Sequence, residues 1–441
     1  MNPLRHLSFG SLRHGLSSLF DNLPDSRQQG KVDYALHDAV MSGFACMFFQ
    51  DPSLLQFQER LEEVQHRNNL RTLFGVHEVP ESTQMRTLID GVASSEFRPI
   101  FPTYLSRLQR GEHLDSFELF PGLYLCAIDG SQYYSSPHIH CPNCLTTHHR
   151  NGKTTYSHKV MQGAIMHPSM RQVLPLMPEE ISNRDGGTKQ DCEVNAAKRL
   201  LPKLREDYPD LGLIIAGDGL FSTQPFISAL SSAQMHYILV AKPTDHTCMM
   251  AWLEAYGVSR MLEKRVIDER DNLHIYRWLN QVPLNGYPDT IKVNYIDYRI
   301  MNYDQDNNEI VVYHNSWVTD LLITRKNVEL LVKGGRCRWK IENEGFNTLK
   351  NQGYHVNHNY GHGSNHLCFN FYVLTLIAFY FHQIFELTDV LYQLCRKKFG
   401  SKAHMWETLR SYIKILVFED WRHLLDFAYR PSTYHLSFHP P

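Results

Sequence analysis

The segment GLYLCAIDG, residues 122–130, is a short apolar run that ends in an Asp-Gly pair at Asp129. An apolar run of this length, closed by a turn dipeptide, is typical of a buried β-strand. A second run of the same kind, LGLIIAGDG at residues 211–219, ends in the same pair at Asp218. We therefore expect two buried strands of one sheet, each with an aspartate at its carboxyl end.

The segments around these two strands alternate between strand and helix patterns. Strands are expected at 156–168, 171–181 and 236–243, and amphipathic helices at 189–206 and 222–234. Strands that alternate with helices after an initial meander are typical of the α/β class. The sequence therefore predicts a mixed sheet with flanking helices.

The rest of the chain falls into segments of different texture. Residues 1–118 show helical spacing of apolar positions, residues 262–324 read as five strands, and a helix is expected from about residue 325 onward. We predict a helical N-terminal region at 1–118, an α/β unit formed by 119–243 and 325–390, a β-rich insertion at 244–324 and C-terminal helices at 391–441.

The bulk composition excludes little. The 44 Lys and Arg against 46 Asp and Glu give a net charge of −2, so any nucleic-acid binding would need local basic patches. Nine scattered cysteines favour a reducing compartment. The N-terminus lacks a continuous apolar stretch that would indicate a secretory signal. The apolar run at 368–385 carries polar residues, which favours a buried core helix over a membrane span.

The two Asp-Gly pairs are candidates for a metal site. Ligands of open α/β sheets bind at the carboxyl ends of central strands, where Asp129 and Asp218 are expected. Hard divalent cations prefer oxygen ligands, and two of them can stabilise the attacking and leaving oxygens of a phosphoryl displacement. Either pair alone would more simply be a turn, but two pairs in one sheet favour a site.

The segment RCRWKIENEGFNTLK, residues 336–350, contains the third acidic candidate. At 100° per residue on an α-helix, Glu342 lies about 40° from Arg338 and about 80° from Lys350, and Glu344 lies off that face. A solvated helix with an Arg–Glu pair at i, i+4 would give the same pattern. We predict that Glu342, and not Glu344, carries the chemistry.

These segments together resemble the DDE transposases of bacterial cut-and-paste insertion sequences, over about residues 120–360. The group with a β insertion before its last acidic helix carries a Tyr-x2-Arg-x3-Glu-x6-Lys signature. Arg338 and Glu342 have the required spacing. The Tyr slot falls on Gly335, and the Lys slot falls one residue before Lys350. The resemblance implies an RNase H-like catalytic domain that cuts and joins DNA.

The resemblance also implies cofactors and partners. Asp129, Asp218 and Glu342 would hold two Mg²⁺ or Mn²⁺ ions, and the residues expected to contact DNA are Arg338, Lys340, Lys350 and Trp317. Trp317 could equally be a strand residue in a small core. The expected partners are terminal inverted repeats, target DNA and a second copy of the chain, in a bacterial cytoplasm and not at a membrane. A non-catalytic DNA-binding relative and an RNase H-like nuclease without strand transfer are the alternatives.

The segment HIHCPNCLTTHHRNG, residues 138–152, is a second chemical feature. Cys141 and Cys144 have the spacing of a zinc knuckle, and structural zinc takes four N or S ligands. We favour His140 and His149 as the other two ligands, with His158 as a further candidate; two free cysteines in a His-rich loop are the alternative. Thiolates are too soft for magnesium, so this would be a separate metal.

A short segment with two acidic residues, KQDCE at 189–193, forms the start of the helix expected at 189–206. Acidic side chains at a helix start interact favourably with the helix dipole. We therefore assign Asp191 and Glu193 to helix capping rather than to the active site.

Overall fold

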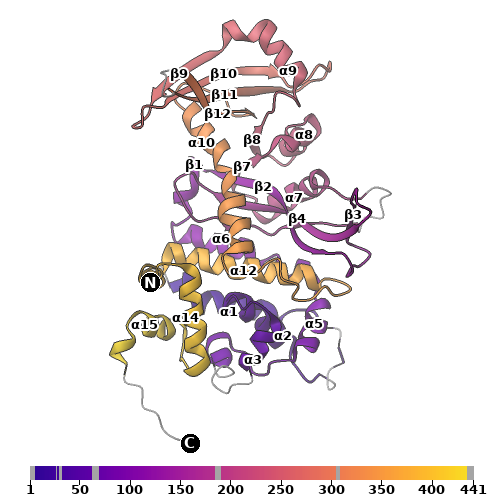
Figure 1. Cartoon of the computed structure of the whole chain (residues 1–441), viewed down its shortest axis with the longest axis vertical. Helices are drawn as coiled ribbons and strands as arrows, with labels where there is room; N and C mark the ends of the chain where they lie inside the picture. The colour runs from indigo at the N-terminus through magenta and orange to yellow at the C-terminus, as the bar shows by residue number, and fades with distance from the viewer. Residues whose placement is uncertain are drawn as a thin grey trace, which may run out of the picture.

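A computed structural model of the chain describes residues 5–25, 27–28, 32–61, 69–183, 190–303 and 308–434. The predicted mixed α/β class is confirmed, because a single large mixed sheet is accompanied by many helices. Lys189, at the start of the acidic segment, lies outside the described residues. In Figure 1 the sheet occupies the upper part of the molecule, and most of the helices form a layer beneath it.

Within the described residues the sheet has twelve strands, and nine of them follow the order β3-β4-β2-β7-β8-β12-β11-β10-β9. Strand β1 pairs with β2, and strands β5 and β6 pair with β4. The bounds are β1 Glu118–Phe120, β2 Leu123–Ser136, β3 Leu145–His148, β4 Thr154–Met166, β5 Leu174–Pro175, β6 Glu179–Ile181, β7 Gly212–Gly217, β8 His236–Val240, β9 Leu262–Ile267, β10 Leu273–Pro283, β11 Lys292–Tyr303 and β12 Glu309–Thr319.

The first Asp-Gly pair does not end its strand. The parallel pairing of β2 with β7 runs only as far as Ala127 opposite Ala216, but β2 continues to Ser136 because it pairs with the long antiparallel strand β4. The expectation that Asp129 closes the strand is therefore wrong. Asp218 does follow the last residue of β7 directly. An apolar pattern identified the strand but could not show how far its antiparallel partner extends it.

The β-rich segment continues the same sheet. Strand β12 pairs antiparallel with β8, with Trp317 opposite Val240, so β9 to β12 extend the central sheet at one edge. The last two strands expected in this segment are one strand, because β12 runs unbroken through Asn315 and Ser316. These two residues resemble a turn in the sequence, yet the ladder with β11 is continuous through them.

Helices from both ends of the chain form the layer beneath the sheet (Figure 1). They surround α12, Leu367–Thr388, most of whose residues are buried. By length and composition α12 could cross a membrane, but 94% of its most apolar window is buried inside the protein, as expected for a core helix. The neighbouring helices are α1 Phe9–Asp21, α2 Leu36–Phe48, α3 Leu54–Leu61, α5 Ser82–Asp90, α6 Ile100–Arg110, α13 Val390–Phe399, α14 Lys402–Ile415 and α15 Trp421–Tyr429.

A buried asparagine, Asn69, links the N-terminal and C-terminal helical regions by hydrogen bonds. The Asn69 side chain donates to the carbonyl oxygens of Ile413 and Leu416, at 2.9 and 2.6 Å, and accepts from the Phe418 amide at 2.9 Å. Phe48 and Trp421 pack edge to face in the same layer. The N-terminal and C-terminal helices therefore share one hydrophobic core.

Candidate active site and metal cluster

The two predicted aspartates lie on neighbouring parallel strands. Asp218 follows β7, and its Oδ1 accepts from the Leu220 amide at 2.9 Å, which caps the 3-10 turn that begins at Gly219. Asp129 lies on β2, two residues beyond the last residue of β2 that pairs with β7. The negative charge of Asp218 contributes to a raised pKa at Asp129. The two carboxylates therefore lie close enough for the charge of Asp218 to affect the pKa of Asp129.

Arg338 holds the Asp129 carboxylate. Its Nη1 donates to Asp129 Oδ2 at 3.0 Å, and the two side chains are 12% and 24% exposed. Burial raises the pKa of Asp129, and the guanidinium of Arg338 opposes that rise. The arginine predicted to contact phosphate thus neutralises a predicted metal ligand in this arrangement.

The helix that carries Glu342 is not a regular α-helix throughout. Helix α10, Val328–Cys337, leads through Arg338 to a π-helical turn, Ile341–Phe346, which continues into α11, Asn347–Asn351. The assumption of 100° per residue is therefore wrong across this turn, because a π turn holds more residues than an α turn. The π turn packs against β2, the strand of Asp129.

Glu342 and Glu344 are both exposed but have different neighbours. Burial lowers the pKa of Lys350, and the charge of Glu342 opposes this effect. The charge of Glu344 acts instead on Lys402, at the start of α14. The two glutamates therefore differ in their surroundings, and Glu342 is the one that neighbours the predicted basic residue Lys350.

Glu193, which the sequence pattern assigned to helix capping, lies beside Asp129. It begins α7, Glu193–Asp207, and its charge contributes to the raised pKa of Asp129. A Cβ placed on Gly130 would lie 2.5 Å from Glu193 Cδ, so the glycine is what allows this carboxylate to approach β2. The signal was its place in the acidic segment KQDCE, which we assigned to capping.

Asp191, in the same acidic segment, has a structural role other than capping. Its side chain accepts from the Ser182 and Cys192 amides and pairs with Arg199 Nη2 at 2.6 Å. These bonds connect the end of β6 to the start of α7. The Asp191 contacts therefore support the position from which Glu193 reaches Gly130.

Two of the residues predicted to contact DNA are engaged inside the protein. Lys340 Nζ donates to the carbonyl oxygens of His167, Pro168 and Met170, which uses its three N–H groups. Trp317 is fully buried, as the alternative of a core tryptophan expects. In this arrangement Lys340 has no N–H free for a phosphate, and Trp317 has no exposed face on which a base could stack.

The cysteine pair belongs to a compact Cys–His cluster. Cys141, Cys144, His158 and His362 each offer one donor atom, and all four atoms lie within 4.8 Å of one another. Hydrogen bonding with Cys144 lowers the pKa of the Cys141 thiol, while burial opposes this effect. The same contact raises the pKa of the Cys144 thiol, so the positions of the four donor atoms, and not the thiol pKa values, support a metal site here.

Two predicted zinc ligands are not in the cluster. His140 is exposed and stacks on Tyr156, and His149 Nε2 contacts Thr155 Oγ1 at 2.7 Å, so neither of these two histidines lies in the cluster. His158, the further candidate, is in the cluster. His362 was missed because it lies 218 residues from Cys144 in the sequence, and no local spacing connects the two.

The carboxylates around Asp129 and the Cys–His cluster differ in how their side chains are arranged for binding a metal ion. Among the described residues, the Cys–His cluster is the group in which three or more possible metal ligands have their donor atoms close together. The carboxylates around Asp129 are oxygen donors suited to hard cations, but Arg338 occupies one of their oxygens. No protein-family model and no curated protein match the chain. The function is therefore inferred from side-chain geometry and from the sequence resemblance.

Proposed function

We propose that this protein is a DNA transposase that cuts and joins transposon ends with a DDE triad of Asp129, Asp218 and Glu342. The single observation that supports this most is the placement of Asp129 on β2 and of Asp218 directly after the adjacent parallel strand β7, with Arg338 bound to Asp129. The helix with Arg338 and Glu342 follows the β-rich segment and packs against β2. An RNase H-like catalytic domain is compatible with this mixed sheet.

The proposed chemistry is an in-line displacement at phosphorus. A water oxygen forms a bond to the phosphorus at the element end, the bond to the 3′ oxygen breaks, and a 3′-hydroxyl is released. That hydroxyl then attacks a target phosphate, forms a new P–O bond and displaces another 3′ oxygen. Two Mg²⁺ ions, when bound, would stabilise the attacking and leaving oxygens. Asp129 and Asp218 would hold these ions, and Glu342 would complete the set.

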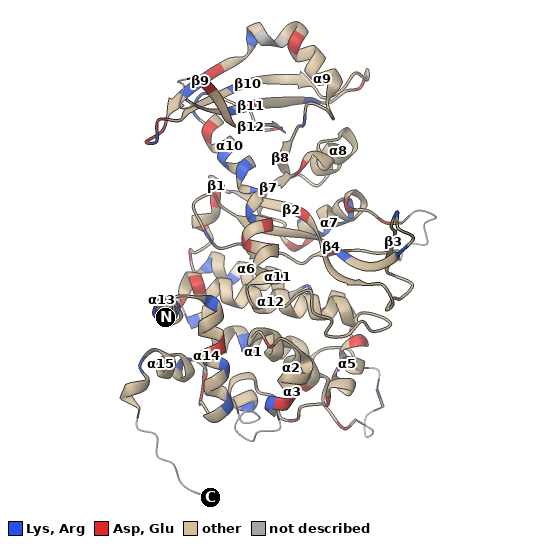
Figure 2. Ribbon diagram, viewed as in Figure 1, with Lys and Arg blue, Asp and Glu red and all other residues tan. Residues whose placement is uncertain are grey.

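Several side chains around the triad have parts in this proposal. Arg338 would leave Asp129 for a DNA phosphate, since a guanidinium binds either group with two parallel hydrogen bonds. Glu193 would add negative charge beside Asp129. Figure 2 shows basic positions along α10, and Lys333 and Arg336 of this helix are exposed. These two residues are better placed than Lys340 to contact the DNA backbone.

The proposed setting follows from the proposed reaction. The partners would be DNA with terminal inverted repeats, target DNA and a second copy of the chain that brings two ends together. The protein would work on the chromosome in the bacterial cytoplasm. The burial of α12 supports this setting, since the apolar helix is already covered by protein.

The experiment uses a DNA fragment with the inverted repeats that flank the gene, a target plasmid, Mg²⁺ and purified protein. We expect cleavage at the repeat ends and joined products from the wild type, and neither from Asp218→Ala. Cleavage without joining would support a nuclease instead. Specific binding of the repeats without cleavage would support a non-catalytic relative. Joining that is unchanged in Asp218→Ala would contradict the proposed triad.

A further inference from the structure

The donor atoms of the Cys–His cluster have the separations of a tetrahedral zinc site. Zn–S bonds of about 2.3 Å and Zn–N bonds of about 2.0–2.1 Å imply tetrahedral edges of about 3.8 Å for S–S, about 3.5 Å for S–N and about 3.3 Å for N–N. The two sulfurs of Cys141 and Cys144 are 3.8 Å apart, and Nε2 of His158 and His362 are 3.1 Å apart. Three of the four S–N separations are 3.6, 3.3 and 3.4 Å, and the fourth, between Cys141 and His362, is within 4.8 Å.

We propose that Cys141, Cys144, His158 and His362 bind one structural Zn²⁺ ion. Four protein ligands complete a tetrahedron, so no position remains for water or substrate, which distinguishes a structural from a catalytic zinc site. Two thiolates and two imidazoles match zinc and do not match magnesium. The ligand set rests on this geometry alone and does not depend on the proposed transposase activity.

Neighbouring groups orient both histidines toward the ion. Nδ1 of His362 lies 3.0 Å from the Gly363 carbonyl oxygen, which requires the ring proton on Nδ1 and leaves Nε2 free to bind metal. Nδ1 of His158 lies 3.5 Å from the carboxylate of Glu180 on β6. A metal-bound histidine usually has its second nitrogen beside a carbonyl or a carboxylate, as both do here.

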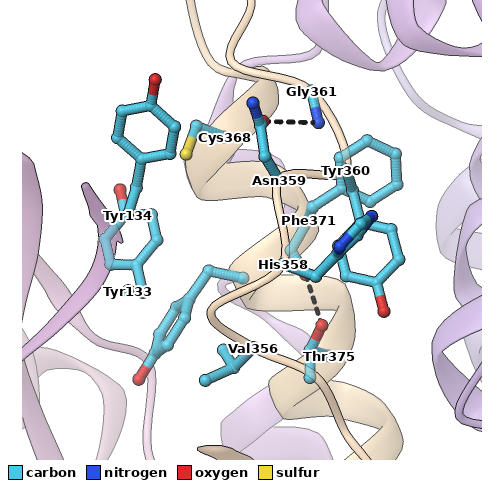
Figure 3. A pocket seen from close by; sticks show the side chains of 11 residues that line it. Tyr133, Tyr134, Val356, His358, Asn359, Tyr360, Gly361, Cys368, Phe371 and Thr375 are labelled. Atoms are coloured by element: carbon cyan, nitrogen blue, oxygen red, sulfur yellow. Dashed lines mark hydrogen bonds between the residues drawn. The ribbon is translucent and has the colours of Figure 1, made fainter. Parts of the chain in front are cut away.

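The site would join three distant parts of the chain. Cys141 and Cys144 lie between β2 and β3, His158 is on β4, and His362 lies between α11 and α12. Figure 3 shows the segment with Tyr360 and Gly361 beside α12, and Tyr133 and Tyr134 of β2 facing it. The ring of Tyr134 also packs on His362, with centroids 4.7 Å apart.

A second contact holds the segment of His362 from its other side. The Asp90 carboxylate, at the end of α5, accepts from four consecutive amides, those of Ser364, Asn365, His366 and Leu367. Asp90 therefore holds the end of this segment where α12 begins, and the metal site would hold the residues just before it, at His362. Because α11 continues the π turn of Glu342, zinc would also fix the chain that leaves the proposed active site.

The test is the zinc content of the full-length protein, purified without added chelator, for the wild type and four variants. We expect one zinc ion per chain in the wild type, and loss of stoichiometric zinc in Cys144→Ser and in His362→Ala. The matched controls are His140→Ala and His149→Ala, which remove exposed histidines near the cluster and should retain all the zinc. Circular dichroism of each variant shows whether it is folded.

A spectroscopic measurement on the wild type keeps the test independent of how the variants fold. Zinc X-ray absorption should give two sulfur neighbours at about 2.3 Å and two nitrogen neighbours at about 2.0–2.1 Å. A wild type without zinc, zinc held only by nitrogen and oxygen, retention in both His362→Ala and Cys144→Ser, or loss in the two controls would each overturn the proposal. None of these results bears on DNA joining, so failure here is distinguishable from failure of the transposase proposal.

Discussion

Asp129 is surrounded by opposing charges that set its behaviour. Burial and the carboxylates of Asp218 and Glu193 raise its pKa, and Arg338 lowers it. A buried carboxylate with acidic neighbours is stabilised by any cation placed among them. Arg338 supplies that cation in this structure, and a divalent metal would supply more charge at the same place. Under the proposed function, Arg338 and a metal ion would compete for the Asp129 carboxylate.

Glu193 gives a prediction at this scale. Glu193→Gln removes a negative charge beside Asp129, which should weaken cation binding and lower the cleavage rate by about tenfold or more at limiting Mg²⁺. The loss should shrink as the Mg²⁺ concentration rises, because added metal offsets weaker binding. Cleavage rates measured over a Mg²⁺ titration check this expectation. Glu206→Gln, an exposed position on the same helix, is the control, and equal losses in both variants would contradict the role of Glu193.

Asp191 gives a stability prediction with a defined pH dependence. Burial opposes ionisation of Asp191, but hydrogen bonds from Arg199 and two amides lower its pKa below the usual value. A lowered pKa in the folded state contributes stability above the unfolded pKa of about 3.9, and this is lost as pH falls through the folded value. Asp191→Asn should therefore cost about 1–3 kcal/mol of unfolding free energy at pH 7, and progressively less below about pH 4.

Urea unfolding of Asp191→Asn at several pH values measures this dependence. Asp210→Asn, at an exposed position, should change the unfolding free energy little at any pH. A penalty for Asp191→Asn that is the same at pH 7 and near pH 3 would show that charge on Asp191 contributes nothing.

At the scale of elements, α10 lies close against β12 through a single glycine. A Cβ on Gly335 would lie 2.6 Å from Nε1 of the buried Trp317. Gly335 occupies the slot where the resemblance expects a tyrosine, and no tyrosine side chain would fit there without displacing the tryptophan. The departure from the signature thus has a packing cause, namely the close approach of helix and strand.

The helix–strand contact predicts that substitutions of two glycines in the same helical segment change the stability of the protein by different amounts. Gly335→Ala should destabilise the protein by about 1–3 kcal/mol, because the added methyl group overpacks a buried contact. Gly345→Ala should change stability by less than about 1 kcal/mol, since the nearest atom to its Cβ would be 3.9 Å away. Thermal and urea unfolding of both variants provide the comparison. A Gly335→Ala protein as stable as the wild type would refute the close packing.

The elements differ in how far the sequence could predict them. The buried strands at Asp129 and Asp218 were found because apolar runs closed by Asp-Gly are local signals. The π turn at Ile341–Phe346 was not, because hydrophobic spacing alone does not distinguish one wide turn from regular helix. His362 was beyond local reasoning, since only the folded chain brings it to Cys144. Glu193 was noted in the sequence, but no local pattern shows that it packs against Gly130.

At the scale of the molecule, helices from the two ends of the chain close one layer under the sheet (Figure 1). Asn69 makes three hydrogen bonds, two of them buried, to the segment between Ile413 and Phe418. The sequence predicts 1–118 and 391–441 as separate helical regions, because no local pattern indicates that they pack together. Their contact makes the two segments parts of one hydrophobic core.

Asn69→Ala should destabilise the whole molecule. The substitution leaves one buried carbonyl group, one partly buried carbonyl group and one buried amide without their partner, at a cost of about 2–4 kcal/mol. Because the two ends share one core, we expect a single lowered unfolding transition rather than early release of the C-terminal helices. Asn351→Ala, at an exposed position, is the control for urea unfolding followed by circular dichroism. Two separate transitions in Asn69→Ala would contradict the shared core.

The central claim is that Glu342, and not Glu344, completes an acidic active site with Asp129 and Asp218. The most direct measurement compares Mg²⁺-dependent cleavage of DNA with the flanking inverted repeats by the wild type, Glu342→Gln and Glu344→Gln. We predict a loss of at least about 100-fold for Glu342→Gln, as expected when a group that stabilises the transition state is removed. Glu344→Gln should retain most of the wild-type rate. Equal rates for the two variants, or full cleavage by Glu342→Gln, would contradict the account.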